Sequence, residues 1–122
     1  MTEISYGKKQ THWMWYIFPQ IQGLGFSESA KYYAVRDIRE AAAYLAHPIL
    51  GARLETIARE LLKHKDKTAQ QIFGSPDDLK LRSSMTLFAA LPAADPVFSQ
   101  VIDQFFKGES DLKTQHILGM QA

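Results

Sequence analysis

A lysine and two serines on one predicted helix are the residues whose types and spacing best suit chemistry. Lys80, Ser83 and Ser84 fall on one face of a helix with 3.6 residues per turn. A desolvated lysine within hydrogen-bond reach of a serine can activate it as a nucleophile, so Lys80 and Ser84 are candidate catalytic residues. The same ammonium and hydroxyl groups would also suit an anionic ligand. The simpler structural alternative is that the serines bond back to the preceding turn or let another helix pack closely.

A short aromatic stretch near the N-terminus is the second candidate part of a site. It contains both tryptophans of the chain, Trp13 and Trp15, with Tyr16 beside them, and it runs from His12 to Gln20. These aromatic rings could stack on a base, while the lysine and hydroxyls hold phosphate. A small anionic, nucleotide-like ligand such as an ADP-ribose derivative would fit this combination. His12 is a candidate general base, although a histidine bonded to a backbone carbonyl is the more ordinary interpretation.

Two hypotheses of different kinds follow from these residues. In the first, the aromatic stretch and the helix of Lys80 to Thr86 converge on one concave pocket that binds a small molecule, with or without catalysis. In the second, the chain is a protein-interaction module that uses an apolar groove at Trp13 and Trp15. The second hypothesis predicts an exposed apolar patch without convergent polar groups. The sequence leaves open whether the protein is an enzyme.

Composition limits the other function classes. The chain has 122 residues, which fits one domain, and a net charge of +1, too small for a protein held mainly by phosphate contacts, so nucleic-acid binding is not expected. Cysteine is absent, which fits a reducing cytoplasm and removes thiolate chemistry. No apolar run approaches membrane-spanning length. The four histidines lack metal-ligand spacing, so we expect no metal site and no cofactor.

The spacing of apolar residues predicts a compact all-α domain of six or seven short helices. His47-Pro48 and Asp95-Pro96 are typical of helix starts. In each pair a residue able to cap the helix, His47 or Asp95, precedes a proline, which is favoured in the first helical position. Strand pairing is expected only in the continuously apolar residues 12–18. The expected helices, with Ser27 and Asp66 as caps of the first and third and Gly74 ending the third, cover residues 27–46, 50–62, 66–73, 75–91, 95–108 and 111–120.

The order of motifs resembles one family. The chain carries, in this order, HWMWYIFPQ, GLG, YLAHP, IFG, DLKL and SSMTLF. This combination covers nearly the whole chain and is similar to the DUF1810 family, whose members are small bacterial and fungal proteins. The resemblance implies a single all-α domain over residues 1–122 and implies no established activity. Family members usually carry a further amphipathic segment before the position of Met1. Either the start of the chain was assigned too late, or this protein lacks that segment. If it lacks it, an apolar groove near Trp13 and Trp15 would be open, and a homodimer would become plausible.

Overall fold

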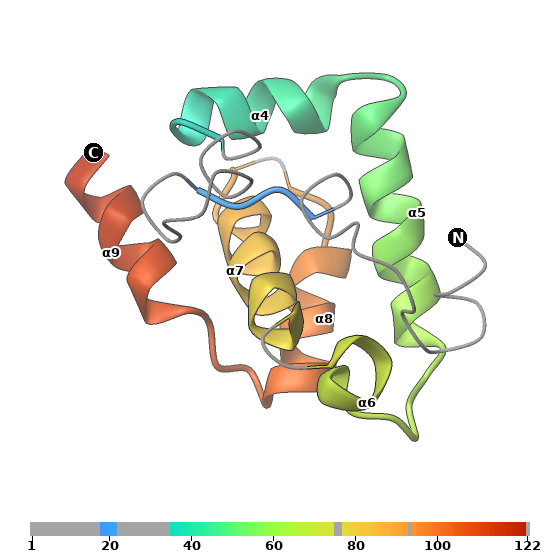
Figure 1. Cartoon of the computed structure of the whole chain (residues 1–122). Helices are drawn as coiled ribbons and strands as arrows, with labels where there is room; N and C mark the ends of the chain where they lie inside the picture. The colour runs from blue at the N-terminus through green and yellow to red at the C-terminus, as the bar shows by residue number, and fades with distance from the viewer. Residues whose placement is uncertain (1–17, 22–34, 75–76, 93, 122) are drawn as a thin grey trace.

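The computed structural model describes residues 18–21, 35–74, 77–92 and 94–121, and these residues form a helical domain (Figure 1). The predicted all-α fold is confirmed, because the described ranges contain six helices and, apart from them, one isolated β-bridge. No helix in these ranges is long and apolar enough to cross a membrane. The helices are α4 (Ile38–Ala46), α5 (Leu50–Leu62), α6 (Ala69–Phe73), α7 (Asp77–Ala89), α8 (Val97–Phe106) and α9 (Leu112–Gln121).

Helix α7 is the centre of the domain. It packs against α4, α6, α8 and α9, and its residues from Ser83 to Phe88 are all buried (Figure 1). A helix enclosed on several sides needs apolar side chains around most of its circumference, and α7 has Leu81 and Met85 on one side and Leu87 on another, all buried. The hydroxyl side chains on the same helix are therefore interior groups.

The junction between α4 and α5 is tight. The Nδ1 atom of His47 accepts hydrogen bonds from the backbone amides of Ile49 and Leu50, each at 3.1 Å, so the predicted capping role of His47 is confirmed. Gly51 follows where the two helices meet, and a Cβ atom added there would overlap the carbonyl oxygen of Leu45. Only glycine lets the backbones approach this closely.

Helix α4 is also joined to the central helix by an aromatic contact. The Tyr44 ring centroid lies 5.7 Å from that of Phe88, which is fully buried. Burial raises the pKa of the Tyr44 phenol, because the phenolate would lose its hydration, and the charge of Arg53 opposes this shift. The neutral tyrosine is thus the form that the fold stabilises.

The predicted helix over residues 27–46 is wrong in its extent. Helix α4 begins only at Ile38, because the Asp37 backbone is extended and its carboxylate accepts a hydrogen bond of 2.9 Å from the Glu40 amide. Aspartate in this position satisfies an amide that would otherwise lack a partner at the helix N-terminus. The predicted cap, Ser27, lies outside the described residues.

Residues just before α4 pair with an extended segment instead of continuing the helix. Val35 forms a parallel β-bridge with Ile21, and the Val35 amide donates to the Gln20 carbonyl at 2.8 Å. Strand pairing was predicted only for residues 12–18, so this bridge corrects the prediction. Val35 and Ile21 are both buried. Val35, which lies within the predicted helix over residues 27–46, is therefore buried in an extended conformation and not as part of a helix.

The cap of helix α6 lies two residues after the predicted one. The side chain of Thr68 accepts from the Gln71 amide at 3.1 Å, and the Gln71 side chain accepts from the Thr68 amide at 2.8 Å. This reciprocal capping box replaces the predicted cap, Asp66. The predicted end is confirmed, since Gly74 follows Phe73 with φ of +76°, a conformation that favours glycine.

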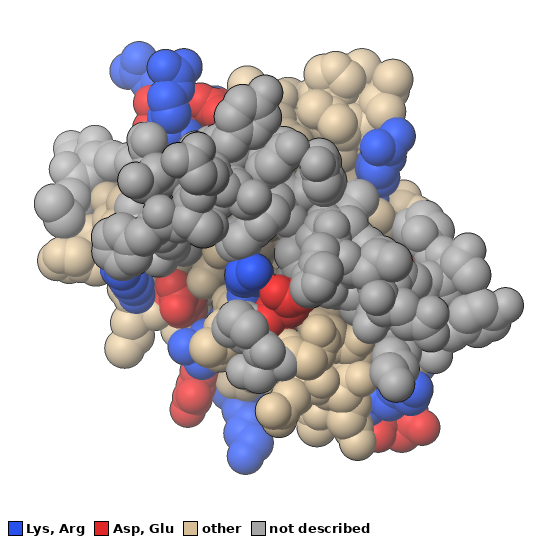
Figure 2. Space-filling model, in the orientation of Figure 1, with Lys and Arg blue, Asp and Glu red and all other residues tan. Residues whose placement is uncertain are grey.

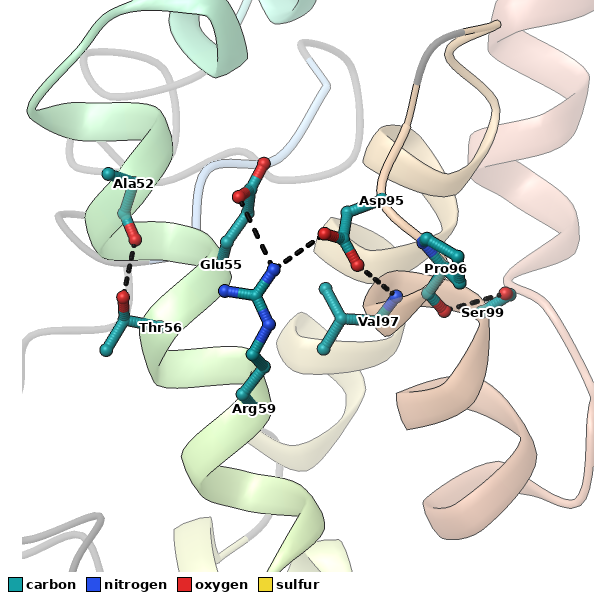
Figure 3. Close-up of polar contacts among 8 residues, drawn as sticks. All are labelled: Ala52, Glu55, Thr56, Arg59, Asp95, Pro96, Val97 and Ser99. Atoms are coloured by element: carbon teal, nitrogen blue, oxygen red, sulfur yellow. Dashed lines mark hydrogen bonds and ion pairs between the residues drawn. The ribbon is translucent and has the colours of Figure 1, made fainter.

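An ion pair joins α5 to the start of α8 (Figure 3). The Nη2 atom of Arg59 lies 2.6 Å from Asp95 Oδ2 and 3.7 Å from Glu55 Oε2. The other carboxylate oxygen of Asp95 accepts from the Val97 amide at 2.9 Å, which caps α8. The i,i+4 pair of Glu55 and Arg59 on α5 is thus present, but the shorter contact of Arg59 is with Asp95.

Candidate functional site

Two of the hydroxyls on α7 are used within the helix. Ser83 Oγ donates to the Leu79 carbonyl at 3.1 Å, and Thr86 Oγ1 donates to the Arg82 carbonyl at 2.8 Å. Thr86 Oγ1 also accepts from the Asp111 amide at 2.9 Å, which links α7 to the start of α9. For Ser83 the structural alternative, a bond back to the preceding turn, is confirmed.

Ser84 differs from its neighbours. Its side chain is 0% exposed, and its Oγ has no hydrogen-bond partner. Lys80 lies one turn before it on the same face, with Nζ 3.0 Å from Asp77 Oδ1 and a quarter (25%) of its side chain exposed. The hydrogen bond that a Ser84–Lys80 nucleophile pair requires is therefore not formed in this arrangement, and a catalytic role for either residue stays a prediction.

Among the predicted site residues of the aromatic stretch, the structure describes Gln20. It is buried, and its amide nitrogen Nε2 has no hydrogen-bond partner. Its neighbour Phe18 packs edge-to-face on Phe73 of α6, with ring centroids 5.9 Å apart. Phe18 belongs to the same apolar core as the residues of α7. The structure thus places Phe18, two residues before Gln20, in the core that also contains Leu81 and Met85 of α7.

Two further unpaired polar atoms lie on α7 and were not singled out from the sequence. They are Asp78 Oδ1 and Arg82 Nε, one helical turn apart. The Arg82 guanidinium lies 5.9 Å from the Phe106 ring centroid, and its Nη2 is 3.8 Å from Asp111 Oδ1. The spacing of an acid and a base at i and i+4 was the available signal. Spacing does not reveal whether a group is buried, so it could not identify these two atoms.

Three of the four buried side-chain atoms that lack partners in the described ranges thus belong to α7. Each such group costs about 1–3 kcal/mol when it stays unpaired, so native proteins usually supply a partner, often water or a ligand. Figure 2 shows basic and acidic side chains adjoining over α7 in the middle of the face that it displays. The central helix therefore carries most of the buried side-chain atoms that lack a hydrogen-bond partner in the described ranges.

The remaining predicted site residues, His12, Trp13, Trp15 and Tyr16, lie outside the described residues. Their convergence with α7 and the apolar groove of the protein-interaction hypothesis stay predictions. Among the described residues, no three histidine, aspartate or glutamate side chains are placed to hold a metal ion.

The fold and this site define a class of protein: a small all-α domain built around one buried helix with unpaired polar groups. Residues 1–118 match the family described as "Protein of unknown function (DUF1810)", and the chain belongs to that family. The family resemblance seen in the motifs is confirmed.

One solved structure gives the fold an independent match. The crystal structure of the conserved hypothetical protein Rv1873 from Mycobacterium tuberculosis is similar with a TM-score of 0.94 and 41% sequence identity. The match covers 97% of this chain and 84% of that one. None of the curated proteins matches the chain. Neither the family nor the Mycobacterium tuberculosis protein has a stated activity, so function has to be argued from the site.

Proposed function

We propose that this protein is a small-molecule binding domain whose polar contacts come from α7 and Gln20. The supporting observation is that Gln20 Nε2 and Ser84 Oγ are buried donors without acceptors. They belong to the two sequence segments whose residue types are suited to binding. A ligand acceptor would supply the partner that each donor lacks.

The ligand that suits these groups is small and anionic or nucleotide-like. Carboxylate or phosphate oxygens would accept from Gln20 and Ser84, and the partly exposed ammonium of Lys80 would supply charge. Lys80 is held by Asp77 at 3.0 Å, so an incoming anion would compete with that carboxylate. In this proposal, Trp13 and Trp15 stack on the apolar part of the ligand.

Binding at Ser84 requires local opening, because the side chain is fully buried. The segment that contains Gln20 is extended, and an isolated β-bridge joins its Ile21 to Val35. An enzymatic role would demand more: the ligand would have to draw Lys80 away from Asp77 and towards Ser84, or place His12 beside it. We therefore propose binding as the function and treat catalysis as a further step.

The experiment is a ligand screen with two readouts. Purified protein is titrated with nucleotides, ADP-ribose, NAD, sugar phosphates and amino acids, and both melting temperature and tryptophan emission are followed. Both tryptophans, Trp13 and Trp15, lie in the predicted site, so emission reports on that stretch alone. A ligand at a hundred times its dissociation constant should add about 2.7 kcal/mol to the free energy of unfolding.

Variants place the binding. We expect Lys80→Gln and Ser84→Ala to lose the response, while Lys65→Gln, a change on the exposed link between α5 and α6, keeps it. Equal responses in all three variants would contradict a site at α7. If no compound changes either readout, the binding proposal fails.

A further inference from the structure

A cavity of about 400 Å³ lies between the C-terminal half of α4, α5 and the connection from α7 to α8. Among the described residues that line it, Glu55 carries the one charged side chain and the others are apolar. Small-molecule sites are typically concave and apolar with a few polar groups that fix orientation, and their volumes begin at about 300 Å³. The apolar lining residues are Ala42, Leu45, Ala46, Leu91 and Pro92.

The carboxylate of Glu55 is poorly used by the protein. Arg59 directs its short contact of 2.6 Å to Asp95 and stays 3.7 Å from Glu55 (Figure 3). That separation is too long for a hydrogen bond. Within the described part of the chain, the Glu55 carboxylate has this ion pair as its polar contact. Its oxygens therefore keep their capacity to accept hydrogen bonds from a ligand.

The charges within this group of three ion-paired side chains are also unbalanced. Glu55 and Asp95 carry two negative charges against the single positive charge of Arg59. Asp95 is satisfied by Arg59 and by the Val97 amide at 2.9 Å. The excess negative charge is thus associated with Glu55, the charged residue of the cavity wall. A ligand ammonium would neutralise it through a charge-assisted hydrogen bond.

We infer that this cavity is a second binding site, and that it takes a small apolar molecule carrying one protonated amine. The apolar body would lie against the walls from α4 and the α7–α8 connection, and the ammonium would donate to Glu55. This site uses other residues than the α7 site proposed above and prefers the opposite ligand charge. The two proposals therefore stand or fall separately.

The test compares an amine with its uncharged analogue. Uniformly 15N-labelled protein is titrated with 2-phenylethylamine and with 2-phenylethanol, and amide shifts are followed by NMR. We expect saturable shifts at Leu45, Ala46 and Glu55 with the amine, and weaker binding of the alcohol. Glu55→Gln should reduce the affinity for the amine by at least about tenfold, as expected for loss of a charge-assisted hydrogen bond, and leave that for the alcohol unchanged.

Two further variants separate charge from space. Glu60→Gln is the matched control, because Glu60 is on the same helix, pairs with Lys63 at 3.0 Å and does not line the cavity. It should bind the amine as the parent does. Ala46→Leu places bulk in the cavity from an exposed position and should weaken both probes. Equal affinity for the amine in the parent and Glu55→Gln, no saturable binding, or undiminished binding to Ala46→Leu would overturn the proposal.

Discussion

The unpaired hydroxyl of Ser84 leads to an unusual expectation: removing a buried polar group should stabilise the ligand-free protein. Ser84 is 0% exposed and its Oγ has no partner, so Ser84→Ala breaks no hydrogen bond. An unpaired buried hydroxyl costs about 1–3 kcal/mol, and alanine adds up to about 0.5 kcal/mol of helix propensity. The small void left by the oxygen offsets part of this gain. We expect the free energy of unfolding to rise by about 1 kcal/mol.

The neighbouring serine provides the control. Ser83→Ala brings the same gain in helix propensity in the same helix, but it removes the bond of 3.1 Å to the Leu79 carbonyl. That bond is worth about 0.5–1.5 kcal/mol, so the stability of Ser83→Ala should stay close to that of the parent. The difference between the two variants isolates the unpaired hydroxyl of Ser84.

Thermal unfolding of dialysed, ligand-free protein gives the measurement. An unfolding entropy of about 2.1 cal/mol/K per residue over 122 residues is about 260 cal/mol/K, so 1 kcal/mol corresponds to about 4 °C. Ser84→Ala should melt about 4 °C above the parent, and urea unfolding should give the same order. A Ser84→Ala protein that melts below the parent, or no higher than Ser83→Ala, would show that the hydroxyl has a partner and refute the reasoning.

Two other predictions concern α4 and its contact with the start of α5. Burial raises the pKa of Tyr44, so the protonated phenol stabilises the fold fully below its ordinary value near 10, and this contribution is lost as pH rises through the higher folded value. Stability measured by urea unfolding should therefore fall above about pH 10, and Tyr44→Phe should lessen that fall; an identical alkaline profile for the variant would contradict the assignment. Gly51→Ala should lower the free energy of unfolding by roughly 2 kcal/mol or more, because its Cβ would overlap the Leu45 carbonyl. Parent-like urea midpoints for this variant would mean that the helices separate at little cost.

Local patterns predicted the parts of this fold that depend on neighbouring residues. His47 caps α5 and Gly74 ends α6, because each acts within one turn of its own position. The predicted extent of α4 was wrong for a different reason. Val35 sits where a helical stripe would place an apolar residue, but it is buried by pairing with Ile21. A buried extended residue and a buried helical residue look alike in a pattern of apolar spacing.

The candidate site was likewise predictable only where it depends on residues that are close in sequence. The sequence placed Lys80, Ser83 and Ser84 on one helix, and the structure agrees. It did not show which of the two serines lacks a partner, since that depends on how surrounding elements pack. The contact between Arg59 and Asp95 joins residues 36 positions apart, and no local rule predicts it. Spacing therefore predicted which polar side chains share a helix, and packing determines which of them lack a hydrogen-bond partner.

The central position of α7 has a consequence for synthesis on the ribosome. Two of its packing partners, α4 and α6, precede it in the chain, whereas α8 and α9 follow it. Its buried side chains therefore stay uncovered on one side until the residues of α8 have emerged. A nascent chain that ends at α7 exposes Met85 and Phe88 together with a helix unable to complete its packing. The domain closes late, and until then the buried side chains of its central helix are open to aggregation.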